Sequence, residues 1–250
     1  MTLNNKVAIV TGGGRDIGRS VSLRLAAEGA KVVINYHRDE ASAKETRAQV
    51  IAAGGTAVLH RADVTDAGAV AEMVAAATAQ FGDRIDVLVN LAGGMVARKT
   101  LADMDEAFFD TVMTLNMKSA FLVTKAVLPH IPRGGSIINI ASLAGRDGGG
   151  PGATIYATAK GAMMSFTRGL AKELGPQGIR VNALCPGLIG TSFHDSFSKP
   201  EGRAATAGNT SLRREGHPDE VAAAVAFLAS DDAAFLTGLN MDVNGGLAFS

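Results

Sequence analysis

Tyr156 and Lys160 are four residues apart, a spacing that places two side chains on the same face of a helix. A tyrosine phenol has a pKa of about 10, which is too high for acid–base chemistry at neutral pH. A nearby ammonium group favours the phenolate and lowers that pKa. Ser142 adds a hydroxyl that can hydrogen-bond a substrate oxygen. A Tyr-x-x-x-Lys pair alone is more often an ordinary pair on the exposed face of a helix. Together with Ser142, the pair predicts proton transfer at a carbonyl or alcohol oxygen.

A glycine-rich segment, Thr11-Gly-Gly-Gly-Arg-Asp-Ile-Gly18, follows a short apolar run and opens a helical pattern. In that context glycines let the backbone approach the pyrophosphate of a dinucleotide, which lies at the helix N-terminus. The acid that binds the ribose of NAD about 20 residues further on is missing. Tyr36, His37 and Arg38 occupy that place, and Arg38 with Arg15 suits a 2′-phosphate. We expect NADP(H) in preference to NAD(H), the alternative being that both arginines are solvated surface charges.

Short apolar segments alternate with helical stretches along the chain. Strands are predicted at residues 6–10, 31–35, 56–60, 86–90, 136–140, 179–184 and 239–243. A first helix is predicted at residues 17–28, and a second follows the strand at 31–35 and ends at about residue 53. Further helices are predicted at residues 66–81, 105–130, 154–174 and 218–229. This alternation, with strands apolar throughout, is typical of a doubly wound parallel sheet covered by helices on both faces. We predict one α/β domain of the Rossmann type over residues 1–250, with seven parallel strands and an irregular substrate lid at about 187–215.

The composition excludes several classes of function. The 24 basic and 24 acidic residues cancel, which argues against binding to nucleic acid or an anionic membrane. The only cysteine, Cys185, precludes an intramolecular disulfide and fits a reducing, cytoplasmic setting. The apolar runs are too short for a signal peptide or a membrane span. The five histidines are dispersed, so no metal site is expected.

These motifs together resemble the short-chain dehydrogenase/reductase family along nearly the whole chain. Further landmarks are Asn90-Leu-Ala-Gly93, Asn116, Pro186-Gly187 and Asp242-x-x-Gly-Gly246. The resemblance implies that Asn116 holds a relay water, Ser142 orients the carbonyl, Tyr156 is the acid/base, and Lys160 binds ribose and tunes Tyr156. The expected cofactor-binding residues are Gly12, Gly14, Arg15, Asp16, Ile17, Gly18, Tyr36, His37, Arg38, Asp63, Val64, Asn90, Ala92, Gly93, Tyr156, Lys160, Pro186, Gly187, Ile189 and Thr191.

Two positions depart from the family pattern. Asp16 stands where a glycine is usual, and an anion pointing at the pyrophosphate would be unfavourable. Leu91 replaces the commoner second asparagine, which we expect to be a packing change.

The substrate is expected to be an anionic, hydroxylated carbonyl compound. Basic residues recur on the loops that border the pocket, and a run of glycines beside Ser142 leaves room. Besides Ser142 and Tyr156, the candidate substrate residues are Arg98, Arg146 and His194. Segments of the chain are also similar to bacterial reductases of the keto-uronate 4-deoxy-5-hexoseulose uronate.

Two alternatives remain at this point. Beta-ketoacyl-carrier-protein reductases share the same tetrad, so a 3-oxoacyl substrate is open. A non-catalytic dinucleotide-binding regulator would be free to lose Tyr156, Lys160 or Ser142, and the chain keeps all three. Broad apolar faces on the helices at 105–130 and 154–174, with the resemblance, point to a homotetramer.

Overall fold

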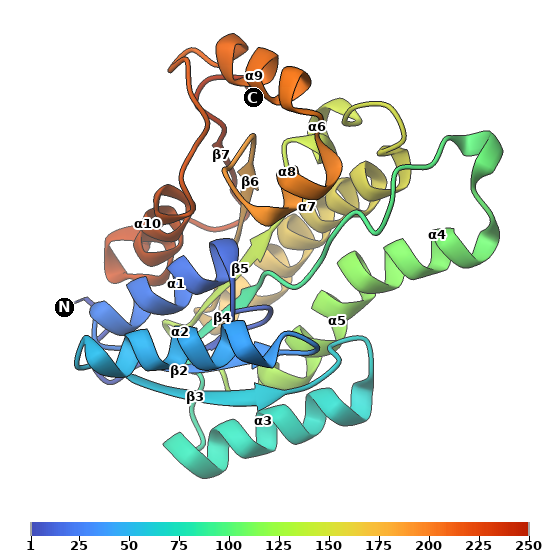
Figure 1. Cartoon of the computed structure of the whole chain (residues 1–250). Helices are drawn as coiled ribbons and strands as arrows, with labels where there is room; N and C mark the ends of the chain where they lie inside the picture. The colour runs from blue at the N-terminus through green and yellow to red at the C-terminus, as the bar shows by residue number, and fades with distance from the viewer. Residues whose placement is uncertain (1, 250) are drawn as a thin grey trace.

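All seven predicted strands lie in one parallel sheet in the computed structural model, which describes residues 2–249 (Figure 1). The strands are β1 (Val7–Val10), β2 (Lys31–Tyr36), β3 (Thr56–Arg61), β4 (Val87–Asn90), β5 (Ser136–Ile140), β6 (Arg180–Pro186) and β7 (Asn240–Val243). Their order is β3-β2-β1-β4-β5-β6-β7, and Ala8 of β1 pairs with Val32 on one side and Val87 on the other. The order reverses between β1 and β4, where ligands bind in open sheets of this kind.

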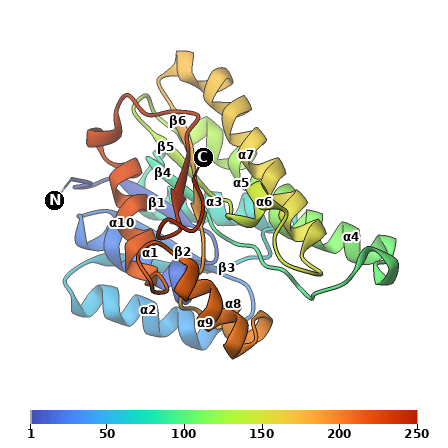
Figure 2. The same cartoon turned by 90° about the horizontal axis from the view of Figure 1, so that it is seen from above.

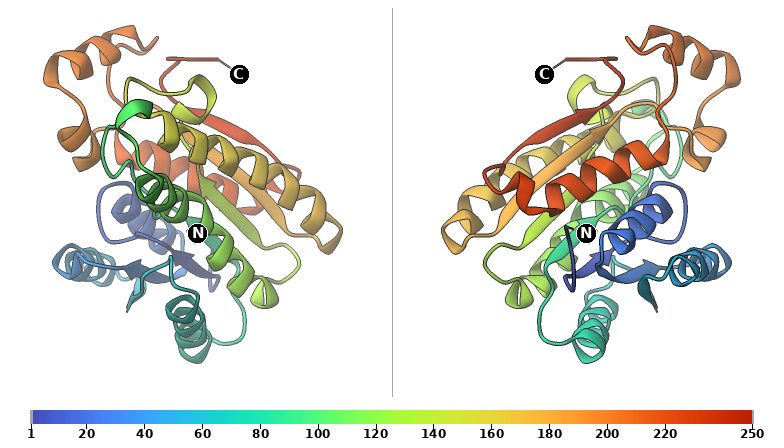
Figure 3. Two further views of the ribbon diagram at one scale, coloured as in Figure 1. Left: turned by 90° about the vertical axis from the view of Figure 1, so that its right-hand side faces the viewer. Right: turned by 90° about the vertical axis from the view of Figure 1, so that its left-hand side faces the viewer.

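Helices cover both faces of this sheet, as the two views of Figure 3 show. One face carries α1 (Asp16–Ala27), α2 (Glu40–Ala52) and α10 (Pro218–Ala229), and the other carries α3 (Ala67–Phe81), α5 (Ser119–Val127) and α7 (Thr154–Leu174). Leu25 and Val225 fill the first layer, and Met73 and Leu174 fill the second. Because both faces are covered, every residue of β1 is buried, which explains why the strands show no polar alternation.

The helix predicted over residues 105–130 is interrupted in the structure. It consists of α4 (Glu106–Met113), a π-helical turn at Thr114–Lys118, and α5, followed by a 3₁₀ turn at Leu128–His130. The side-chain amide of Asn116 donates to the Val112 carbonyl at 2.9 Å, which is the acceptor that the Asn116 N–H would use in a regular α-helix. This substitution widens the turn, and such π turns are frequent at functional sites.

The segment at 187–215 is more regular than predicted. It contains α8 (Ser192–Phe197) and α9 (Pro200–Asn209), and α8 lies beside the start of α1 (Figure 2). Neither helix has a fully buried side chain. A helix without a buried face needs no apolar periodicity in its sequence, which explains why these two were not predicted. A further short helix, α6 (Ala144–Asp147), follows β5.

Candidate active site

The glycine loop turns tightly between β1 and α1. A Cβ atom at Gly18 would lie 2.1 Å from the Gly12 carbonyl oxygen, and Gly12 itself has a φ of 65°, so both positions require glycine. The Gly12 N–H donates to Oδ1 of Asn35 at 3.2 Å, and the Gly13 N–H donates to the Asn35 carbonyl at 2.9 Å. Asn35 was not among the predicted site residues. Its signal in the sequence is a lone amide side chain near the end of an apolar strand.

The predicted adenosine-binding residues come together beside this loop. Tyr36, His37 and Arg38 lie at and just after the end of β2, and Nδ1 of His37 is 3.8 Å from Oδ2 of Asp63. Hydrogen bonds from the Thr65 hydroxyl and N–H hold the pKa of Asp63 below its usual value. The Arg38 side chain is exposed, and that of Arg15 is 61% exposed, so both cations are accessible to an anion. A closely packed glycine turn flanked by exposed cations fits a phosphorylated dinucleotide.

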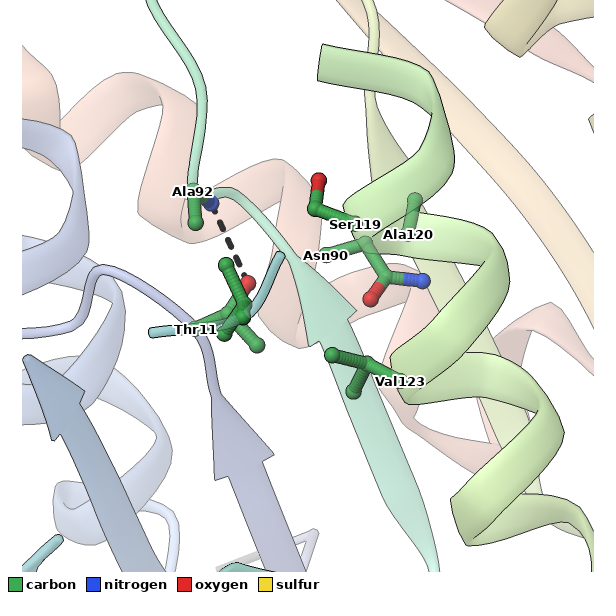
Figure 4. Close-up of a pocket in the computed structure, with 7 residues that line it drawn as sticks. Thr11, Asn90, Ala92, Ser119, Ala120 and Val123 are labelled. Carbon is green, nitrogen blue, oxygen red and sulfur yellow. Dashed lines mark hydrogen bonds between the residues drawn. The ribbon is translucent and has the colours of Figure 1, made fainter. Parts of the chain in front are cut away.

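Thr11 joins the loops that follow β1 and β4. Its hydroxyl oxygen accepts hydrogen bonds from the N–H groups of Leu91 (2.9 Å) and Ala92 (3.1 Å), the second of which is drawn in Figure 4. Leu91 packs against the core, as predicted. Asn90 is buried between the same strands and donates to Thr124 and Asn139 at 3.0 and 2.9 Å. Its amide oxygen has no hydrogen-bond partner among the described residues and lies beside a narrow pocket that Thr11 and Val123 also line.

Tyr156 and Lys160 project from the first turns of α7 and are both buried, 9% and 4% exposed. Nζ of Lys160 donates to the Ile140 carbonyl at 2.8 Å and lies 5.8 Å from the centre of the Tyr156 ring. Burial lowers the pKa of Lys160 to about 8. Burial also raises the pKa of Tyr156, against a smaller lowering by its hydrogen bond with Ser142. Desolvation of the phenol therefore opposes the lowering of its pKa that we expect from the Lys160 ammonium.

Asn116 is held beside this pair by the π-helical turn. Its Oδ1 accepts from the Gly94 N–H at 2.9 Å, and its Nδ2 donates to the Gly94 carbonyl at 2.8 Å. A Cβ atom at Gly93 would lie 2.6 Å from Oδ1 of Asn116 and 3.3 Å from Nζ of Lys160. The structure thus brings Asn116, Ser142, Tyr156 and Lys160 together. Gly93 lies between Asn116 and Lys160, where a side chain would not fit.

The loop after β6 closes the other side of the crevice. Pro186 ends β6, and its carbonyl accepts from the Leu143 N–H at 2.9 Å, next to Ser142. A Cβ at Gly187 would lie 2.8 Å from Cβ of Asn244, so a larger residue does not fit there. Ile189 is buried and pairs with Gly216, and Thr191 is the residue before α8.

The side of the pocket above Tyr156 is aromatic, which the sequence reasoning missed. The Phe193 ring lies 5.9 Å from the Tyr156 ring and 5.1 Å from that of Phe197. His194, on the same helix, hydrogen-bonds Ser198 through Nδ1 at 2.9 Å, and burial lowers its pKa. The available signal was two aromatic residues in a segment otherwise rich in small and polar residues.

The two arginines predicted at the substrate end differ. Arg98 is exposed and donates from Nε to the Phe197 carbonyl at 2.9 Å and from Nη1 to the Pro151 carbonyl at 2.8 Å. Arg146 instead pairs with Asp242 at 2.8 Å and donates to the Asn240 carbonyl at 2.5 Å, both on β7. We therefore withdraw Arg146 as a substrate anchor, because its charge is neutralised by a partner on the last strand.

Two expectations about the rest of the chain can be compared with the structure. Within residues 2–249, no group of three His, Cys, Asp or Glu side chains is arranged to hold a metal ion. In the same range, no helix combines the length and the apolar character needed to cross a membrane. Cys185 is buried, and burial raises the pKa of its thiol to about 11, as suits a packing residue.

Comparisons with known proteins agree with this fold. The family model described as enoyl-(acyl carrier protein) reductase matches residues 12–248. A 3-oxoacyl-[acyl-carrier-protein] reductase of Synechocystis is 40% identical over 98% of both chains. A short-chain dehydrogenase of Burkholderia cenocepacia, solved in complex with NADP, superposes with a TM-score of 0.93 at 32% identity over 99% of both chains. A blue fluorescent protein from a metagenomic library, solved with NADPH, has a TM-score of 0.93 at 36% identity over the whole of both chains.

The seven-stranded sheet, the glycine loop and the buried Tyr–Lys pair define a dinucleotide-dependent oxidoreductase. The chain belongs to the short-chain dehydrogenase/reductase family.

Proposed function

We propose that the protein is an NADPH-dependent reductase of a small anionic keto compound, such as the keto-sugar acid 4-deoxy-5-hexoseulose uronate. The observation that carries the substrate class is Arg98. Both hydrogen-bond acceptors of its guanidinium are backbone carbonyls, and it forms no salt bridge within residues 2–249. Its positive charge is therefore available to a carboxylate near Phe197 on α8 and Pro151 in the glycine-rich loop. An arginine–carboxylate contact is worth about 1.5–3 kcal/mol when partly desolvated.

NADP(H) as the cofactor rests on two features of the chain and on the solved structures it resembles. No carboxylate ends β2, and Arg38 and Arg15 are exposed at the position where a 2′-phosphate would bind. Two of the solved structures it resembles contain NADP or NADPH. NAD(H) is the alternative, and kcat/KM for NADPH and NADH in the wild type and in Arg38→Asp decides between them. When bound, the nicotinamide supplies or accepts the hydride of the reaction.

The residues of the chain handle the proton and the orientation of the carbonyl. Ser142 donates a hydrogen bond to the carbonyl oxygen, and Tyr156 gives its phenolic proton to that oxygen as negative charge develops. A tyrosine phenol is protonated at neutral pH and so carries the proton to be given. Burial raises the pKa of Tyr156, and the positive charges of Lys160 and of the oxidised nicotinamide would counteract that rise. Lys160, released from the Ile140 carbonyl, would hold the ribose hydroxyls, and Asn116 would hold a relay water.

A second candidate is reduction of a 3-oxoacyl thioester. It is favoured by the aromatic and aliphatic wall of the pocket, to which Met95, Phe108, Phe193 and Phe197 contribute. The names of relatives also favour it, since the 40%-identical Synechocystis protein is a 3-oxoacyl-[acyl-carrier-protein] reductase. An acyl chain would use the wall, whereas a keto-sugar acid would use the charge of Arg98.

A panel assay separates the two. NADPH oxidation is followed with a keto-uronate, a neutral diketone and acetoacetyl thioesters at matched concentrations. We expect the highest kcat/KM for the keto-uronate. A higher value for the thioesters would contradict the proposal and support the second candidate.

We also propose a homotetramer in the cytoplasm. A groove of about 480 Å³ on α4, α5 and α7 is lined by Met113, Met117, Phe121 and Phe166, and Phe121 is 43% exposed. A helix with this much uncovered apolar surface needs a second partner, which symmetric oligomers supply. Light scattering of the protein and of Phe121→Glu tests this. A tetramer that the substitution dissociates is expected, and a monomeric wild-type protein would contradict it.

The cytoplasmic location rests on the single, buried Cys185.

A further inference from the structure

Asp16, the residue of the glycine loop that departs from the family pattern, is hydrogen-bonded to Ser192, which lies far along the chain. Its Oδ1 accepts from the Ser192 N–H at 3.1 Å, and its Oδ2 accepts from the Ser192 hydroxyl at 2.6 Å. Ser192 is the first residue of α8, whose Phe193 ring lies 5.9 Å from that of Tyr156. The carboxylate at the base of the dinucleotide loop is therefore attached to the substrate side of the site.

Arg15 completes this contact. Its Nη1 donates to the same Ser192 hydroxyl oxygen at 3.1 Å and lies 3.8 Å from Oδ2 of Asp16. The guanidinium thus offsets the negative charge of a carboxylate that stands close to the expected diphosphate. Hydrogen bonds to an ionised group are about twice as strong as those between neutral groups.

The position of α8 depends on such polar contacts. Phe193 and Phe197 pack only partly buried against the pocket wall, and no side chain of α8 is fully buried. At its other end, the Phe197 carbonyl accepts from Arg98. Short helices with few buried apolar contacts open easily unless such bonds hold them.

We propose that Asp16 is a positioning residue for substrate binding. Through Ser192 it fixes the start of α8, and with it Phe193, over Tyr156 before a substrate arrives. Its side chain also explains why an aspartate is tolerated at a φ of 49°, a conformation that favours glycine. This inference rests on the oxidoreductase activity of the family, and it holds for whichever carbonyl compound is the substrate.

Three variants test it. Asp16→Gly removes the carboxylate and suits the backbone conformation, so the fold is retained. Ser192→Ala removes the hydroxyl and leaves the glycine loop unchanged. Ser196→Ala is the matched control, because its hydroxyl donates only to the Ser192 carbonyl within the same helix. Amide hydrogen exchange over residues 191–198, the dissociation constant for NADPH and the substrate KM are measured in each.

We expect the Ser192 amide to exchange roughly tenfold faster in Asp16→Gly, the effect of losing a hydrogen bond to a charged group. Substrate KM should rise in both Asp16→Gly and Ser192→Ala, whereas the Ser196→Ala control should stay near wild type in all three measurements. NADPH should bind Asp16→Gly at least as tightly as wild type, because a negative charge near the diphosphate is removed. Wild-type exchange and KM in Asp16→Gly would overturn the proposal, as would an equal effect in the control. So would weaker NADPH binding with an unchanged substrate KM. The exchange measurement needs no substrate, so it decides this question even if the keto-uronate assignment fails.

Discussion

The floor and the roof of the active site are built in different ways. The floor, which consists of the strand ends and α7, places buried groups such as Tyr156 and Lys160 by regular secondary structure. The roof, which consists of α8 and α9, is held by polar contacts between exposed or half-buried side chains. Arg203 of α9, for example, pairs with Asp195 of α8 at 2.6 Å and with Glu215. The floor thus holds the reacting groups within the core, whereas the roof is held by polar contacts nearer the surface.

The largest expected effect is at the floor. Tyr156→Phe removes the proton donor and should lower kcat by about 10²–10⁴-fold, because general acid catalysis is worth that much. Binding of NADPH, measured by fluorescence, should be retained. A variant that keeps more than about a tenth of the wild-type kcat would contradict the role of Tyr156.

The sequence predicts most of this floor. The seven strands follow from apolar runs that need no context, and the Tyr156–Lys160 pair follows from a four-residue spacing on one helix. The roof was less predictable, since the contact that holds the start of α8 joins Asp16 and Ser192, which are 176 positions apart. Likewise, the lowered pKa of Lys160 depends on burial, which is a property of the packed structure.

The second effect concerns the space between two floor residues. In Gly93→Ala the added methyl group would lie 2.6 Å from Oδ1 of Asn116, so Asn116 or the loop must move. We expect kcat to fall at least about tenfold, because a displaced Asn116 would no longer hold its partner in the reacting position. Gly94→Ala is the matched control, because nothing lies within 4 Å of a Cβ atom there. Equal activities in the two variants would show that the close approach at Gly93 does not matter.

A third effect concerns the cofactor end of the crevice. If Arg38 binds a 2′-phosphate, Arg38→Asp should lower kcat/KM for NADPH by about tenfold or more, because a charge-assisted contact becomes a repulsion. The value for NADH should stay the same or rise. Parallel titrations with the two cofactors measure this, and an equal loss with both would make Arg38 a structural residue only.

The smallest effect is on stability and depends on pH. The pKa of Lys160 is lowered from 10.5 to about 8 in the folded protein, so the unfolded chain binds more protons between these values. The free energy of unfolding should therefore rise with pH in this window, by about 1 kcal/mol between pH 8 and 9. Urea unfolding of wild type and Lys160→Met at both pH values measures the difference. The raised pKa of Cys185, whose ordinary value is 9.0, opposes the trend within this window, and that of Tyr156 opposes it at higher pH. Both groups are present in both proteins, so the difference in slope reports Lys160, and an equal slope would contradict the prediction.

The central claim is that the charge of Arg98, which donates to the Phe197 carbonyl of the roof, selects an anionic substrate, and it is tested most directly at Arg98 itself. Arg98→Met removes its charge, and Lys99→Met on the same loop is the control, because Lys99 already lies 3.8 Å from Asp105. The measurement is kcat/KM for a keto-uronate and for a neutral diketone in both variants. The account predicts a loss of roughly one to two decades for the keto-uronate in Arg98→Met only, with little change for the diketone. Equal losses for both substrates, or an unaffected keto-uronate, would contradict it.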